Sequence, residues 1–225
     1  MNEKKNMAPA KCAVFDLDGV IADSRKMYVR AIALSMKAAG VPAQEEQVEK
    51  NIMPDVSAWV KSMKEEFGAD VLMRIVMHAR DFLTREGWKL VEPVTTVKPL
   101  LDYLRSGGFA IAMATNSPSA YALKVLERAG ISDYFGLVVS CQEQGMKKDA
   151  CLTSILERIG VEPGNAYYIC DTAMDVTNAN SAGVGAIVVF TDIAWDWPDR
   201  ARVEKEGPAT VAGSMEDVIA WLRRG

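Results

Sequence analysis

Residues 12–20 read CAVFDLDGV, and this stretch decides the fold. Its first half, from Cys12 to Phe15, is a continuous apolar run that includes the strand-favouring residues valine and phenylalanine. The run ends in two carboxylates one residue apart, Asp16 and Asp18, which Gly19 follows. Two negative charges so close to each other repel. The sequence therefore predicts either a cation beside them or a chemical use for them.

Similar apolar runs recur along the chain and alternate with helical patterns. The candidate strands are residues 12–17, 109–116, 136–140, 165–171 and 185–190. Helical patterns cover residues 96–107, 119–130, 150–160 and 176–183. Continuously apolar strands that alternate with helices indicate a parallel sheet with helices on both faces. We therefore expect an α/β fold with a Rossmann-like core, whose ligands bind at the carboxyl ends of the strands.

The segment from about Asp23 to Glu92 breaks this alternation. It contains one helical pattern after another and no strand pattern, so it predicts an all-helical insertion after the first strand. Pro93 and Pro99 mark the return of the chain to the sheet. The predicted division is a core domain of residues 10–21 and 94–225, and a helical cap domain of residues 22–93.

Composition excludes several classes of protein. The chain has 225 residues, of which 49% are hydrophobic, and a formal net charge of -4, which argues against a nucleic-acid or membrane partner. The four cysteines are scattered without a CxxC pair, which favours reduced thiols in a cytoplasmic protein. The single histidine, His78, disfavours a histidine metal site or a serine triad. The chemistry must then come from carboxylates, lysines and hydroxyl groups.

Groups of polar residues follow the predicted strands at four places. They are Asp16 and Asp18; Thr115, Asn116 and Ser117; Lys147 and Lys148; and Asp171 and Asp175. Parallel neighbouring strands would bring all four groups to one edge of the sheet. Converging carboxylates suit a hard divalent cation such as Mg²⁺, and small hydroxyl and amide donors suit the oxygens of a phosphoryl group. These are the parts that aspartyl-phosphate chemistry requires.

The order of these motifs resembles the haloacid dehalogenase-like superfamily, in its branch with a helical cap. The stretch DLDGV (residues 16–20) matches motif I, TNS (residues 115–117) matches motif II, and CDTAMD (residues 170–175) matches motif IV. A loop lysine before residues 149–161 matches motif III. The resemblance covers almost the whole chain and implies a hydrolase that uses an aspartyl-phosphate intermediate.

The resemblance also implies a role for each motif residue. Asp16 would be the nucleophile and Asp18 the general acid and base, and Thr115 would hydrogen-bond the phosphoryl group, as would Asn116 and Ser117. The Mg²⁺ cofactor would be held by Asp16, the backbone carbonyl of Asp18, Asp171 and Asp175. A simpler interpretation remains open, in which the motif II residues and the two aspartates of motif IV only cap the helices that follow them.

Two motifs depart from the family pattern. Cys170 stands in motif IV where many relatives have glycine, and motif III is shortened to GMKKDA at residues 145–150. Either Lys147 or Lys148 can therefore be the functional lysine. We expect Lys147 to be the catalytic one, because Lys148 lies closer to the following helix and fits a surface position. Lys148 is kept as a candidate phosphate-binding residue.

The leading hypothesis is a Mg²⁺-dependent phosphatase that acts on a small phosphorylated metabolite, with phosphoglycolate phosphatase as the most similar group. A phosphomutase of the β-phosphoglucomutase type is the alternative, because it would use the same core residues. A non-catalytic phosphate-binding module is a third hypothesis, which the intact set of carboxylates and lysine disfavours. The sequence leaves open whether the protein is a monomer or a homodimer.

Overall fold

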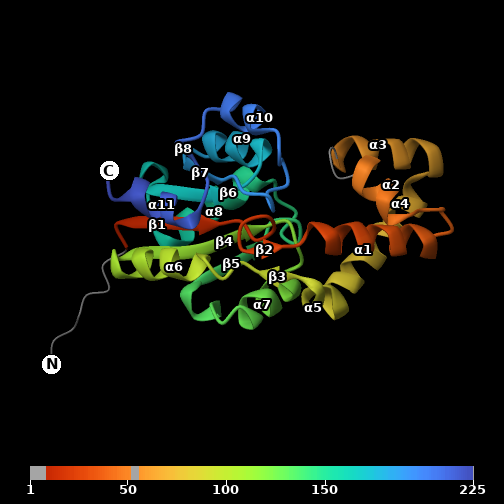
Figure 1. The fold of residues 1–225 in the computed structure, drawn as a ribbon, viewed down its shortest axis with the longest axis horizontal. Coiled ribbons are helices and arrows are strands. Elements are labelled where there is room, and N and C mark those ends of the chain that lie inside the picture. Colours follow the sequence, from red (N-terminus) through yellow and green to blue (C-terminus); the bar gives the residue numbers. More distant parts are fainter. Residues whose placement is uncertain (1–8, 52–55, 225) are drawn as a thin grey trace.

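A parallel sheet of six strands forms the centre of the computed structural model, which describes residues 9–51 and 56–224 (Figure 1). The strand order is β5 (Leu137–Ser140), β4 (Phe109–Thr115), β1 (Lys11–Phe15), β6 (Ala166–Cys170), β7 (Gly185–Val189) and β8 (Thr210–Ala212). Every neighbouring pair in this sheet is parallel. The predicted α/β fold is confirmed.

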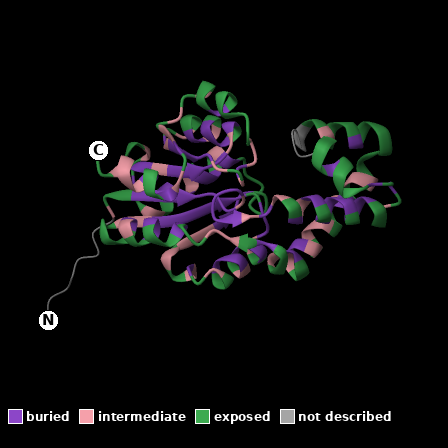
Figure 2. Cartoon of the chain, viewed as in Figure 1, coloured by how far each residue is buried: buried purple, intermediate pink, exposed green. Residues whose placement is uncertain are grey.

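Helices cover both faces of the sheet. One face packs against α6 (Val97–Ser106), α7 (Ser119–Arg128) and α11 (Met215–Leu222). The other face packs against α8 (Lys148–Ile159), α9 (Ala173–Ser181) and α10 (Arg200–Lys205). Successive residues of β1 alternate between the two apolar clusters, so the strand must be apolar throughout, and Figure 2 shows the sheet buried. Burying one Val or Phe side chain contributes about 1.5–3 kcal/mol, which explains the continuous apolar run.

The predicted helical insertion is present between two short strands, β2 (Ala22–Asp23) and β3 (Glu92–Pro93). It consists of α1 (Arg25–Ala38), α2 (Glu45–Asn51), α3 (Val56–Phe67), α4 (Ala69–Phe82), the π-helix η1 (Leu83–Gly87) and α5 (Trp88–Leu90). It has an apolar cluster of its own, which includes Met36, Met63 and Ile75. In Figure 1, α2, α3 and α4 lie to one side of the sheet, and α1 connects them to it. The division into two domains at residues 22 and 93 stays a prediction.

Three strands are missing from the sequence-based expectation, namely β2, β3 and β8. They are two or three residues long, too short to show an alternating or continuous apolar pattern. Two short 3-10 helices, η2 (Ser132–Tyr134) and η3 (Pro163–Asn165), precede β5 and β6. The four cysteines are buried and free, as expected. Among the described residues, no helix has both the length and the apolar character needed to span a membrane.

The register of the strands brings the motif loops together. Phe15 at the end of β1 pairs with Met113 of β4 and with Ile169 of β6. Thr115, the last residue of β4, pairs with Ser140, the last residue of β5. The loops that follow β1, β4, β5 and β6 therefore leave the sheet at the same edge, where a parallel sheet binds its ligands.

Candidate active site

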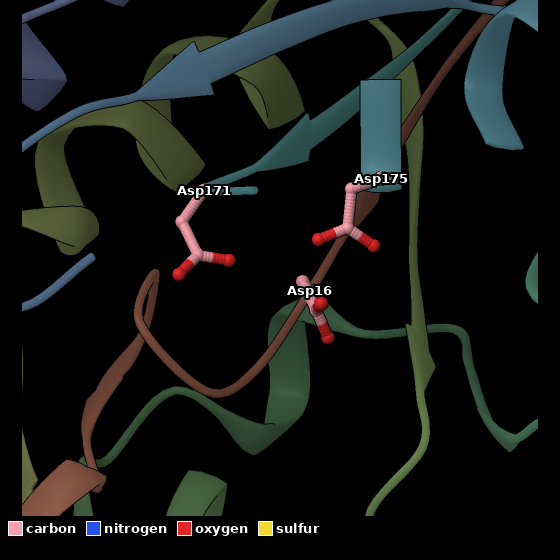
Figure 3. A group of neighbouring side chains, drawn as sticks. All are labelled: Asp16, Asp171 and Asp175. Atoms are coloured by element: carbon pink, nitrogen blue, oxygen red, sulfur yellow. The ribbon is translucent and has the colours of Figure 1, made fainter. Parts of the chain in front are cut away.

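Three buried carboxylates meet at this edge of the sheet (Figure 3). Asp16 follows β1, Asp171 follows β6, and Asp175 lies in the first turn of α9. One oxygen of each lies within 4.8 Å of one oxygen of the others. The exposed fractions are 9% for Asp16, 1% for Asp171 and 6% for Asp175. The structure thus brings together three of the four residues that were predicted to hold a metal.

The local fold fixes two of these carboxylates. The backbone N–H of Leu17 donates to Asp16 Oδ1 at 2.8 Å. At α9, Thr172 is the N-cap, and its hydroxyl oxygen accepts from the Asp175 N–H at 3.1 Å. The Tyr168 hydroxyl donates to Asp175 Oδ1 at 3.2 Å. The alternative in which Asp171 caps α9 is wrong, because Thr172 has that place.

Lys148 is the cation of the site. Its Nζ lies 3.0 Å from Asp16 Oδ2 and 3.8 Å from Asp175 Oδ1, and it also donates to the Ala114 carbonyl at 3.0 Å. The residue is 5% exposed, whereas Lys147 is exposed. The expected surface position of Lys148 is wrong. Lys148 is the first residue of α8, and its ammonium group lies beside the end of β4. The carboxylates of Asp16 and Asp175 compensate the charge of this buried group.

The electrostatics of this group are dominated by burial and by mutual repulsion of the carboxylates. The pKa of Asp16 is raised to about 6, because burial and the charges of Asp175 and Asp18 raise it by more than Lys148 lowers it. Burial, followed by Asp175 and Asp16, holds the pKa of Asp171 well above its usual range. Burial opposes the charge of Lys148, but the carboxylates of Asp16 and Asp175 outweigh this effect and its pKa is raised. Three carboxylates face one lysine, so the donor set fits a hard divalent cation.

Gly19 controls how closely the motif I loop approaches Asp171. Its φ angle is +76°, a conformation that glycine adopts without strain. A Cβ at this position would collide with Asp171 Oδ2 and would lie 2.9 Å from the Trp195 ring. The backbone N–H of Trp195 in turn donates to Asp171 Oδ2 at 2.7 Å. Glycine is thus required for the loop to pass beside the carboxylate cluster.

Asp18 lies in a different environment, among hydroxyl groups. Its Oδ2 accepts a hydrogen bond from Ser117 Oγ, and the Tyr28 hydroxyl lies 3.3 Å from the same oxygen. Its Oδ1 accepts from the Tyr121 hydroxyl at 3.3 Å. Burial raises the pKa of Asp18, and the hydroxyl groups of Ser117, Ser24, Tyr121 and Tyr28 around it lower it. The side chain of Asp18 is therefore surrounded by different groups from those that surround the three clustered carboxylates.

The motif II residues differ in burial and in their contacts. Thr115 is buried, and its Oγ1 accepts from the Ser117 N–H at 3.0 Å. Ser117 is buried beside Asp18, whereas Asn116 is exposed. None of these side chains caps α7, whose N-cap is Pro118. The capping alternative for motif II is therefore not what the structure shows.

Sequence reasoning missed Tyr28, Tyr121 and Trp195. Tyr28 lies on α1 and Tyr121 on α7, and both are separated in sequence from the motifs that they contact. Trp195 follows β7 in a loop without regular helix or strand. Tyr28 lies only ten residues after Asp18, and this short separation in sequence was the one signal for its contact with motif I.

Comparison with known proteins identifies the family of this chain. A model of the haloacid dehalogenase-like hydrolase family matches residues 13–189, from β1 to the end of β7. The chain belongs to this family. The match confirms the resemblance found in the four motifs and makes the protein a haloacid dehalogenase-like hydrolase with helices inserted between β1 and β4.

The relatives of this hydrolase are named for different activities. A phosphoglycolate phosphatase of Yersinia pestis is 29% identical over 192 residues, which cover 77% of this chain and 78% of that protein. The tyrosine-protein kinase PtkA of Mycobacterium tuberculosis is 26% identical over 179 residues, covering 78% of this chain and 60% of that protein. A solved structure of a haloacid dehalogenase-like family hydrolase from Streptococcus pneumoniae has a TM-score of 0.79 at 20% identity, covering 96% of this chain and 100% of that one, which shows the shared fold.

Proposed function

We propose that the protein is a Mg²⁺-dependent phosphatase that hydrolyses a small phosphorylated metabolite through an aspartyl-phosphate intermediate on Asp16. One observation carries the proposal. Asp16 lies among carboxylates and is paired with the buried Lys148, while Asp18, two residues later, lies among hydroxyl groups. Two neighbouring carboxylates in such different environments are suited to different roles, one as nucleophile and one as proton carrier.

In the first step, an oxygen of Asp16 forms a bond to phosphorus while the bond to the leaving oxygen breaks. The electron pair of that bond goes to the leaving oxygen, which takes the proton of Asp18. Lys148 holds the second oxygen of Asp16 at 3.0 Å and so orients the nucleophile. In the second step, water forms the new bond to phosphorus and gives its proton to Asp18, and the Asp16 carboxylate is released.

The proposed metal ligands are Asp16, the backbone carbonyl of Asp18, Asp171 and Asp175. Bound Mg²⁺ supplies positive charge to the phosphoryl oxygens and to the clustered carboxylates. The buried position of the three clustered carboxylates supports this assignment, because a bound cation would offset their repulsion together with Lys148. Thr115 and the backbone of Asn116 are proposed as donors to the phosphoryl oxygens.

The helical insertion is proposed to exclude water and to select the substrate. Arg80 of α4 forms an ion pair with the core, because its Nη2 lies 3.2 Å from Glu143 Oε1 in the loop after β5. The Glu143 carboxylate also accepts from the Ser119 hydroxyl at 2.6 Å. The Arg80–Glu143 pair therefore connects the insertion to a core loop at the carboxyl edge of the sheet. The phosphoglycolate phosphatase of Yersinia pestis supports a small phosphorylated acid as the first substrate to test.

The test is phosphate release from dinitrophenyl phosphate with MgCl₂, followed by a panel of phosphorylated acids, sugars and nucleotides that includes phosphoglycolate. We expect turnover by the wild type, none by Asp16→Asn, and wild-type turnover by Asp133→Asn, a matched change at an exposed aspartate on η2. Formation of an isomer of the substrate without phosphate release would contradict the phosphatase proposal and would favour the phosphomutase alternative. Unchanged turnover by Asp16→Asn would refute the proposed nucleophile.

A further inference from the structure

Three hydroxyl groups hold both oxygens of the Asp18 carboxylate. Ser117 donates to Oδ2, and the hydroxyl of Tyr28 lies 3.3 Å from the same oxygen and within hydrogen-bonding distance of Ser117 Oγ. The proton of Ser117 points to Asp18, so Ser117 accepts its second hydrogen bond from Tyr28. Tyr121 donates to Oδ1 at 3.3 Å. The result is a chain of hydrogen bonds from Tyr28 through Ser117 to Asp18.

The three hydroxyls come from different parts of the fold. Ser117 follows β4 and Tyr121 lies on α7, so both belong to the elements that pack on the sheet. Tyr28 lies on α1, the first helix of the insertion. Of these three partners of Asp18, it is the one that the insertion contributes. Any shift of α1 relative to the sheet therefore changes the hydrogen bonds of Asp18 directly.

Aromatic packing holds the Tyr28 ring in place. Its centroid lies 5.1 Å from that of Trp195 at an interplanar angle of 76°, and 6.5 Å from that of Tyr121, also at 76°. These edge-to-face contacts are favourable for aromatic pairs. Trp195 is the residue whose N–H donates to Asp171 Oδ2. Tyr28 thus packs against Tyr121, which is hydrogen-bonded to Asp18, and against Trp195, which is hydrogen-bonded to Asp171.

We propose that Tyr28 is a positioning residue through which the helical insertion orients the Asp18 carboxyl group toward the leaving oxygen of the substrate. The proposal rests on the proposed phosphatase function. Tyr28 forms no bond to the substrate and carries no proton to it. It holds Ser117 and Asp18 in one arrangement, so that the proton of Asp18 reaches the leaving oxygen as the bond from that oxygen to phosphorus breaks.

The test compares esters that differ in their need for a proton. Dinitrophenolate leaves without protonation, whereas the alkoxide of an alkyl phosphate such as glycerol phosphate requires it. For Tyr28→Phe, which keeps the ring and its packing, we expect the rate of phosphoenzyme formation from the alkyl ester, measured in a single turnover, to fall about 10- to 100-fold, within the range of general acid catalysis. We expect the rate of phosphoenzyme formation from dinitrophenyl phosphate to stay within about twofold, because its leaving group needs no proton and the nucleophile and phosphoryl site are unchanged. The water step, in which Asp18 is the base, is common to both esters and should slow equally for both.

The matched control is Tyr134→Phe. It removes a tyrosine hydroxyl that contacts Lys98 and Asp102 rather than Asp18, and both esters should keep their wild-type rates. A second measurement uses an Asp18→Asn background, in which Tyr28→Phe should leave the rate of phosphoenzyme formation from dinitrophenyl phosphate unchanged. Tryptophan fluorescence and the unfolding midpoint establish that each variant is folded.

Equal losses in the rate of phosphoenzyme formation from both esters would overturn the positioning role, because they would show a general disturbance of the site. No loss on either ester would overturn it as well. If the wild type hydrolyses neither ester, the proposed function falls and this inference falls with it. Turnover of both esters by the wild type, combined with the selective loss in Tyr28→Phe, supports both.

Discussion

Replacing Asp171 by asparagine should stabilise the metal-free protein, although it removes a proposed metal ligand. Asp171 is 1% exposed and lies within 4.8 Å of oxygens of Asp16 and Asp175. At a separation of at most 4.8 Å, each repelling pair costs at least about 3.5 kcal/mol with an effective dielectric constant of about 20. Proton uptake by Asp171 and the charge of Lys148 offset part of this cost. We therefore expect a gain in unfolding free energy on the order of 2 kcal/mol.

Asparagine suits this test because it keeps the size of the side chain and an oxygen that can accept from the Trp195 N–H. The assay is urea unfolding of wild type and variant, first with a chelator and then with MgCl₂. Wild type should gain about 2.7 kcal/mol when free Mg²⁺ is 100 times its dissociation constant, and the variant should gain much less. The order of stability should therefore reverse or become equal when the metal is added.

The matched control is Asp133→Asn, which changes an exposed aspartate and should move neither curve by more than about 0.5 kcal/mol. A less stable Asp171→Asn variant in chelator would refute the reasoning, because it would show that the charge of Asp171 stabilises the fold. An equal gain from MgCl₂ in wild type and variant would place the metal elsewhere.

Three further predictions follow from the same contacts. Lys148→Met should abolish turnover and lower the unfolding free energy by about 3–5 kcal/mol in urea, since it leaves buried carboxylates unpaired, whereas exposed Lys147→Met should change it by less than about 0.5 kcal/mol. Gly19→Ala should prevent turnover and weaken Mg²⁺ stabilisation, because its Cβ would collide with Asp171; wild-type values for both would contradict the assigned loop geometry. The pKa of Asp16 is raised from 3.8 to about 6, so between these values the native state binds more protons than the unfolded state. In chelator, the unfolding free energy of the wild type should therefore fall as pH rises from about 4 to about 6. The fall, measured relative to Asp16→Asn, should be up to about 3 kcal/mol. If the unfolding free energy of the wild type relative to Asp16→Asn rises between about pH 4 and about pH 6, the raised pKa of Asp16 is contradicted.

The sheet and the carboxylate cluster could be predicted because their signals are local in sequence. A buried parallel strand must be apolar on both faces, as the run up to Phe15 is, and the polar residues that follow it must lie at the carboxyl edge. The short strand β8 has no such signal, because three residues are too few to show a pattern.

The side chains around Asp18 could not be predicted, because their contacts join distant parts of the chain. Ser117 and Tyr121 are 99 and 103 residues away from Asp18 in sequence, and only the packing of α7 and the loop after β4 brings them to it. The choice between Lys147 and Lys148 could not be made from the sequence for the same reason. Adjacent residues at a helix start point in different directions, and the direction depends on how α8 packs against the sheet.

The central claim is that Asp16 becomes phosphorylated while Asp18 moves the proton. It is tested most directly by mixing Asp18→Asn protein with dinitrophenyl phosphate and MgCl₂, quenching in acid and measuring peptide masses. This ester needs no proton for its first step, but the second step lacks its base, so the phosphoenzyme should accumulate. We predict one added phosphoryl group on the peptide that contains Asp16, and none in the Asp16→Asn, Asp18→Asn double variant. A phosphoryl group on any other residue, or turnover without a phosphorylated peptide, would contradict the account.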